Sequence, residues 1–187
     1  VLNPDFLPHY LSTYTERISL IRALGVSMII PIAFDMEVAK LSAREFIERL
    51  QKYLGMKTLV IGPSFTMGRN REGNADQLAV LCNEMDFSLI IVDPLSLEGT
   101  LVSSTAIREA IGKGDISRAS MLMGRCPSLA GTVVKGFGRG SDLGVPTANL
   151  KVPMDIMMPS DGIYAAWAYV GSIGKYANGP DPLVIRN

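Results

Sequence analysis

Hydrophobic positions recur at helical spacing in two early stretches of the chain, and a capping-box sequence precedes each. Residues 13–16 (TYTE) precede the first stretch, which stops at Gly25, and residues 42–45 (SARE) precede the second, which stops at Gly55. In a capping box, a hydroxyl and a carboxylate satisfy backbone N–H groups at the start of a helix, and glycine often ends one. The pattern therefore predicts two amphipathic helices that end at these glycines.

Short apolar runs without helical spacing alternate with further helical patterns. The apolar runs predict buried strands at 28–32, 58–61 and 89–92. The helical patterns predict helices at about 77–84, 105–111 and 116–123. Helices that alternate with short, fully apolar strands are typical of a parallel sheet covered on both faces. The chain through Arg125 therefore predicts an α/β nucleotide-binding fold.

After Pro127 the pattern changes to short strands, glycines and prolines with no helical period. We expect β-structure at 129–134 and 163–170 and no helix from 136 to 150. The chain has 187 residues, enough for two small domains. The predicted domains are residues 1–127 and residues 128–187.

The segment 131–150 (GTVVKGFGRGSDLGVPTANL) starts as a strand and becomes a glycine-rich basic loop. Its glycines are Gly136, Gly138, Gly140 and Gly144, and its cations are Lys135 and Arg139. Glycines let backbone N–H groups approach an anion closely, and the cations add charge, which suits a polyphosphate. The alternative is a hairpin loop that is rich in glycine for turn reasons alone.

Thr147 and Asn149 follow this loop directly and are two residues apart. In an extended segment their side chains point to the same side. A hydroxyl and an amide oxygen are hard ligands of the kind Mg²⁺ accepts when it also keeps waters and phosphate oxygens. The segment is therefore a candidate Mg²⁺ site.

Two loops of the α/β part follow predicted strands, where such folds bind their ligands. One is the loop 62–73 (GPSFTMGRNREG); the other, residues 102–108 (VSSTAIR), opens a helix. A helix N-terminus carries N–H groups and partial positive charge, and Arg108 could grip phosphate oxygens. The alternative is that Ser104 or Thr105 simply caps the helix and Arg108 lies on the surface. Residue physics alone does not separate these two readings.

The segment from Gly131 to about Val170, including 161–165 (DGIYA), resembles the start of the riboflavin kinase (flavokinase) domain, a small β-barrel. This resemblance implies that the glycine loop covers ATP and that Thr147 and Asn149 hold Mg²⁺. The ATP-binding residues it implies here are Gly136, Gly138, Arg139, Gly140, Gly144 and Thr147.

The run 103–108 resembles a signature of the nucleotidyltransferases that make FAD from FMN and ATP, which have a Rossmann-like parallel sheet. The resemblance implies ATP contacts from Ser103, Ser104, Thr105 and Arg108. The loop 62–73 resembles that family's flavin-adjacent loop, which implies flavin contacts from Ser64, Phe65 and Met67. The order of the two halves is that of the prokaryotic bifunctional FAD synthetases, which act on ATP, riboflavin and FMN.

This sequence departs from the family pattern at three places. The paired-histidine motif of the adenylyltransferases is absent, since the single histidine, His9, stands in a loop where we expect a surface position. Ser64 and Met67 replace the family's usual residues, and no glutamate after Glu109 can serve as the kinase base. The catalytic residues are therefore unassigned, and we expect this chain alone to turn over flavins slowly or not at all.

Composition narrows the class of protein. Hydrophobic residues make up 48% and charged residues 19%, which predicts a packed core, and the zero net charge gives no basic field for nucleic acid or an anionic membrane. Cys82 and Cys126 have no metal or C-x-x-C spacing, so we expect reduced thiols in a cytoplasmic protein. No membrane span or signal peptide is expected, and the sequence sets no oligomeric state. Because the first residue is Val1 rather than Met, we expect a piece of a longer chain.

Two other functions compete with the bifunctional synthetase. The chain could be a truncated or degenerate remnant that binds flavin or nucleotide without turnover. It could also be another α/β nucleotidyltransferase, acting on pantetheine phosphate or nicotinate mononucleotide. The Pro-Thr-Ala-Asn segment at 146–149 argues against the last of these.

Overall fold

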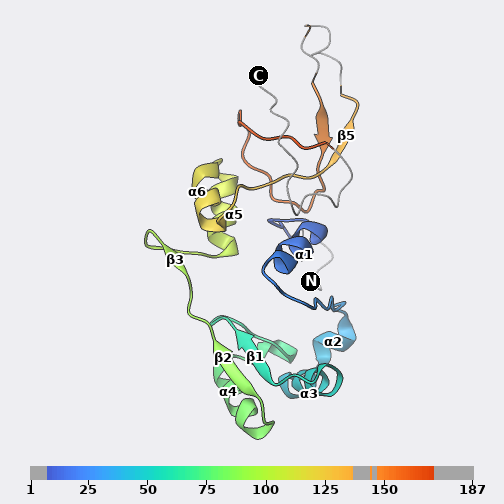
Figure 1. Ribbon diagram of the computed structural model, residues 1–187, viewed down its shortest axis with the longest axis vertical. Helices are drawn as coiled ribbons and strands as arrows, with labels where there is room; N and C mark the ends of the chain where they lie inside the picture. The colour runs from blue at the N-terminus through green and yellow to red at the C-terminus, as the bar shows by residue number, and fades with distance from the viewer. Residues whose placement is uncertain (1–7, 137–143, 145–146, 171–187) are drawn as a thin grey trace. The chain divides into compact units, whose positions relative to one another are not determined.

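The computed structural model describes residues 8–136, 144 and 147–170, which belong to two compact units (Figure 1). The first unit contains Pro31–Leu101. The second contains residues 8–30 together with the described residues from Val102 onward. The second unit thus includes residues on both sides of the boundary predicted at 127/128, which stays a prediction.

The first unit is built on two parallel strands, β1 (Thr58–Ile61) and β2 (Ser88–Ile91), paired from Thr58↔Ser88 to Ile61↔Ile91. Its helices are α2 (Met36–Lys40), α3 (Ala43–Leu54) and α4 (Ala75–Glu84), and η1 (Arg69–Arg71) is a 3₁₀ turn. A short hairpin, β3 (Ser96–Leu97) and β4 (Thr100–Leu101), closes the unit. The core joins α3, α4 and one face of β1 through Ala43, Ile47, Ile61, Leu78, Leu81 and Phe87. The predictions of strands at 58–61 and 89–92 and of a helix at 77–84 are confirmed.

The start of α3 confirms the second predicted capping box. The Ser42 hydroxyl accepts from the Glu45 N–H, and the Glu45 carboxylate accepts from the Ser42 N–H at 2.7 Å. The hydrogen bond from the Ser42 backbone, followed by that from its side chain, holds the pKa of Glu45 below its usual value. Gly55 ends the helix in the left-handed conformation, with φ of 63°, where glycine is favoured.

The other face of the β1–β2 pair is exposed, so the prediction of a sheet covered on both faces is wrong for the described residues. Val60 and its register partner Ile90 are 57% and 50% exposed. The predicted strand at 28–32 is also wrong, because these residues have no strand structure and Met28 is 70% exposed. An apolar run becomes a strand only when a neighbouring strand takes its backbone N–H and C=O groups. Here residues 28–32 pair with no such neighbour in the part of the chain described.

In the second unit, α5 (Ser104–Gly112) packs on α6 (Ile116–Met123), and α1 (Tyr14–Ala23) is the first helix of the chain. The core of this unit is formed by Ile107, Ala110, Ile111, Ala119 and Leu122. Thr13 caps α1 as predicted, accepting from the Glu16 N–H at 3.2 Å. The helices predicted at 105–111 and 116–123 are confirmed.

The later part of the second unit contains one antiparallel pair, β5 (Thr132–Val134) with β6 (Asn149–Lys151). No helix occurs between 136 and 150 among the residues described there, as predicted. The β-structure predicted at 163–170 is found only in part: Ala168 forms a β-bridge, these residues contain no extended strand, and Ile163 and Val170 are 99% and 84% exposed. The structure is therefore α/β with a short parallel pair and short antiparallel pairs.

Candidate functional site

The first candidate site residues lie at the N-terminus of α5. Ser103 is the N-cap, and its hydroxyl accepts from the Ala106 N–H at 3.2 Å. The structure thus assigns the capping role to Ser103 rather than to Ser104 or Thr105, which are exposed in the first turn. Because Ser104 and Arg108 are four residues apart on one helix, they share a face. The first turn of α5 therefore combines two exposed hydroxyls, backbone N–H groups and a cation.

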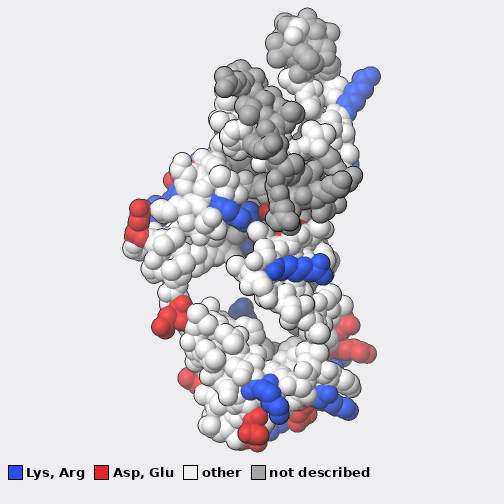
Figure 2. All heavy atoms as spheres, in the orientation of Figure 1, with Lys and Arg blue, Asp and Glu red and all other residues white. Residues whose placement is uncertain are grey.

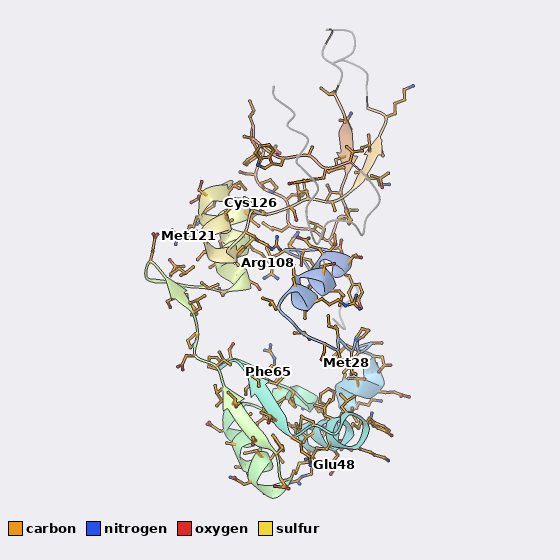
Figure 3. All side chains as sticks on the ribbon, viewed as in Figure 1. Met28, Glu48, Phe65, Arg108, Met121 and Cys126 are labelled. Carbon is orange, nitrogen blue, oxygen red and sulfur yellow. The ribbon has the colours of Figure 1, made fainter. Side chains whose placement is uncertain are left out.

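Arg108, which is labelled in Figure 3, is half-buried, and its Nε donates to the carbonyl of His9 at 2.7 Å. An arginine has five N–H donors in a fixed fork, so this bond uses one and leaves the two terminal nitrogens to other acceptors. The bond orients the guanidinium, which reduces the conformational entropy lost when an anion binds. His9 itself is exposed, as predicted.

The second group of candidate residues lies in the loop that leaves β1 (Figure 3). Ser64 is exposed and Phe65 is 38% exposed, while the half-buried Met67 packs against the core of the first unit. Met67 and Gly73 form an antiparallel bridge, with N–H···O distances of 3.1 and 2.9 Å. Phe65 thus presents an aromatic ring beside a closed loop, an arrangement suited to a flat ligand.

The third group lies at the β5–β6 pair. Asn149 is the first residue of β6 and pairs with Val134, and both Thr147 and Asn149 are exposed. A Cβ added at Gly136 would meet the Asn149 side-chain Nδ2 at 1.9 Å, so the Asn149 amide lies directly against Gly136. The structure thereby brings together two predicted site residues 13 positions apart. Gly138, Arg139 and Gly140 lie outside the described residues.

These groups fit the ligands predicted for them in different degrees. The neutral oxygens of Thr147 and Asn149 suit Mg²⁺ that is also held by phosphate, rather than a metal held by protein alone. No cluster of three or more His, Cys, Asp or Glu side chains able to hold a metal occurs among the described residues.

Figure 2 shows positive and negative side chains interspersed on the visible face of the first unit. None of the helices in the described ranges has the length and apolarity needed to cross a membrane.

Sequence reasoning missed Glu72. Its carboxylate accepts from the backbone N–H of Ala43 at 2.9 Å and so connects the loop after β1 to the start of α3. The two residues are 29 positions apart, so no local pattern points to their contact. The only signal in the sequence is the presence of Gly68 and Gly73 on either side of Glu72, which indicates a close backbone approach.

Comparisons with protein families give two matches along the chain. The model of the FAD synthetase family matches residues 1–106, and the model of the riboflavin kinase family matches residues 123–178. The two matches occur in the order predicted for the two halves.

Curated relatives described as bifunctional riboflavin kinase/FMN adenylyltransferases are similar over most of this chain. The Listeria monocytogenes protein is 31% identical over 156 residues, which cover 83% of this chain and 49% of that protein. The Escherichia coli K12 protein is 32% identical over 162 residues, covering 86% of this chain and 51% of that protein. The chain spans about half the length of the curated relatives it matches.

A solved structure shares the fold. It is described as a macrolide-efflux protein from Streptococcus pneumoniae and matches with a TM-score of 0.76 at 33% identity. The match covers 86% of this chain and 52% of that chain.

Proposed function

Since the chain belongs to the FAD synthetase family, we propose that it is part of a bifunctional enzyme that phosphorylates riboflavin to FMN and adenylylates FMN to FAD. The observation that carries the proposal is the presence of both family matches in one chain, at residues 1–106 and 123–178. In this proposal a Rossmann-like adenylyltransferase part at 1–127 precedes part of a flavokinase barrel at 128–187, and the order of the two matches supports that arrangement. The proposed substrates are ATP, riboflavin and FMN, and the proposed location is the cytoplasm.

In the adenylyl step, the first turn of α5 binds the ATP phosphates. The hydroxyls of Ser104 and Thr105 donate hydrogen bonds to phosphate oxygens, and the terminal nitrogens of Arg108 neutralise their charge. An oxygen of the FMN phosphate attacks the α-phosphorus of ATP, a new P–O bond forms, and pyrophosphate leaves with the electron pair of the broken bond. Phe65, beside Ser64 and Met67, stacks on the flavin ring.

In the kinase step, residues of the β5–β6 pair hold the nucleotide. Thr147 and Asn149 hold Mg²⁺, which when bound neutralises charge on the phosphate oxygens. Backbone N–H groups of the segment 136–144, with the Arg139 guanidinium, surround the phosphates. The riboflavin hydroxyl attacks the γ-phosphorus, its proton passes to a base, and ADP leaves. Positioning and charge neutralisation supply most of the catalysis in such transfers, and these residues supply both.

Turnover and binding together test this function. The purified chain is incubated with riboflavin, ATP and Mg²⁺, and FMN and FAD are followed by chromatography, while calorimetry measures Mg·ATP and FMN binding. Formation of either product, or binding of both ligands without turnover, supports the proposal. The second outcome would identify a binding part whose catalytic groups lie elsewhere. A folded chain that neither binds these ligands nor forms product would overturn it.

A further inference from the structure

The loop after β1 is fastened to the N-terminus of α3 at two points. The backbone N–H of Arg69 donates to the carbonyl of Leu41 at 2.7 Å, and the Glu72 carboxylate accepts from the Ala43 N–H at 2.9 Å. The Met67–Gly73 bridge closes the loop between its ends. Residues 67–73 therefore form a small closed ring held on one helix end, which we call the clamp.

Close packing leaves the clamp little freedom to shift. A Cβ at Gly68 would lie 2.5 Å from the Ala43 backbone nitrogen, and a Cβ at Gly73 would lie 2.7 Å from the Ala43 Cβ. Gly68 also has φ of 75°, a conformation that favours glycine. Ala43 is 2% exposed, so the clamp covers it almost completely. Two glycines and one alanine thus meet where larger side chains would push the loop away.

Glu72 adds a further acceptor for the N–H groups at the start of α3. The capping box satisfies the N–H groups of Ser42 and Glu45, and Glu72 satisfies that of Ala43, which lies between them. A carboxylate is favoured at this position because the helix N-terminus carries partial positive charge, and a charge-assisted hydrogen bond is stronger than a neutral one.

The clamp contains two residues whose backbone is held in the left-handed conformation. Asn70 and Arg71 have φ of 55° and 61°, a region that residues with a side chain seldom adopt. Such conformations persist only where the surrounding structure over-determines them. The two fastening points, at Arg69 and Glu72, stand on either side of this pair.

We propose that Glu72 is a positioning residue for flavin binding: by fastening the clamp to α3, it fixes the loop that presents Ser64, Phe65 and Met67. This inference rests on the proposed function, since it takes those residues as the flavin contacts. Met67 connects the clamp to the proposed flavin contacts, because it belongs to the clamp and lies two residues after Phe65 in the chain. Glu72 acts through the loop and need not contact the flavin.

The test compares FMN and Mg·ATP binding in variants of the full chain. Glu72→Ala removes the carboxylate, and an unfastened loop that is correctly shaped in about one tenth of molecules binds FMN about tenfold more weakly. Glu72→Gln keeps an oxygen that can accept from the Ala43 N–H, so it should restore most of the FMN affinity. Mg·ATP affinity should not change in either variant. Quenching of flavin fluorescence reports FMN binding, and calorimetry reports ATP binding.

Glu84→Ala is the matched control. Glu84 pairs with Arg44, the residue next to Ala43, so its removal takes a carboxylate from the same helix end without touching the clamp. Its FMN affinity should equal that of the wild type. If Glu72→Ala does not fold, Glu72→Asp carries the same test, because it keeps the charge but shortens the side chain by one methylene.

Three outcomes contradict the inference in distinguishable ways. Unchanged FMN affinity in Glu72→Ala would overturn it and leave the proposed function standing. Equal losses of FMN and ATP affinity would also overturn it, because they would show a general structural role. Failure of the wild-type chain to bind FMN would overturn the proposed flavin site and the inference with it.

Discussion

The Nε of Arg108 donates a hydrogen bond to the main-chain carbonyl of His9, 2.7 Å away, across 99 positions of sequence. The same short segment is paired further along: Tyr10 donates to the carbonyl of Asp155 at 2.7 Å, and the Met157 N–H donates to the carbonyl of Tyr10 at 2.9 Å. Arg108 therefore holds the segment that carries Tyr10, and in the proposed function its terminal nitrogens also bind the ATP phosphates. A test of the proposed role must separate it from the observed one.

Replacing Arg108 with alanine should weaken Mg·ATP binding by about 1.5–3 kcal/mol, the range for a charge-assisted contact. Ser103→Ala should weaken it less, because the Ser103 hydroxyl is engaged in capping α5. Calorimetric titration with Mg·ATP measures both. Arg108→Lys keeps the positive charge but loses the fork that reaches the His9 carbonyl, so it separates the two roles. Arg22→Ala, an exposed arginine of α1, serves as the control, and unchanged affinity in Arg108→Ala would leave α5 as an ordinary capped helix.

Gly136→Ala should reduce Mg²⁺-dependent nucleotide binding while leaving the fold intact. The new Cβ would lie 1.9 Å from the Asn149 Nδ2, and the cheapest response is for the Asn149 side chain to move. Displacing a group that orients a metal ligand typically weakens metal binding about 10- to 100-fold. Titration of Mg²⁺ at fixed ATP tests this. Gly112→Ala is the control, since its Cβ would meet only the flexible end of Met157, at 3.1 Å. An equal effect of both variants would count against the Asn149 site.

The capping box at α3 should make stability depend on pH in the acid range. Because the folded-state pKa of Glu45 is lowered, its contribution is fully present above the ordinary glutamate pKa of about 4.3 and is lost as pH falls through the lowered pKa. Glu45→Gln should therefore destabilise the chain at pH 7 and have little effect at pH 2–3. Thermal unfolding at both pH values measures this. Glu48→Gln, at an exposed glutamate of the same helix, is the control variant.

Glu16→Ala should loosen the segment that follows α6. The Glu16 carboxylate accepts from the Ser128 hydroxyl at 2.7 Å and pairs with Arg125 at 3.2 Å. Both members of the ion pair are about three-quarters shielded, so we expect a loss of about 1 kcal/mol and faster protease cleavage near Arg125. Limited proteolysis with trypsin, followed by mass spectrometry, locates the cleavage. Glu37→Ala in α2 is the control, and an unchanged cleavage rate in Glu16→Ala would show that the pair does not hold this segment.

The parts of the fold that the sequence predicts correctly depend on residues close together in the chain. Ser42 and Glu45 are three positions apart, so their capping box can be read directly from the sequence, and Gly55 marks the end of the same helix. The strand at 58–61 was predictable because an apolar run there is bounded by Gly55 and Gly62. The α5 candidate site belongs to this class too, since helix geometry alone fixes which of residues 103–108 share a face.

The parts that the sequence does not predict depend on distant partners. Residues 28–32 have strand-like composition, but composition does not say whether a neighbouring strand exists to pair with. Residues 163–170 form a β-bridge at Ala168 without becoming an extended strand. The clamp is not predictable from the sequence for the same reason. The contact between Glu72 and Ala43 joins two elements, and no local sequence pattern encodes how they pack. Likewise, the contact of Gly136 with Asn149 follows from the register of β5 on β6, not from the spacing of the two residues.

The pairing of Tyr10 with residues 155–157 bears on how the chain could be divided. A single peptide bond joins the two predicted domains at 127/128. Two backbone hydrogen bonds of Tyr10, to residues 155 and 157, also connect the two sides of this boundary. A peptide bond broken between 126 and 130 would therefore leave two backbone hydrogen bonds between the resulting fragments. A chain that ends at the predicted boundary would lose the partner of Tyr10, so the halves expressed separately would be less stable than the intact chain.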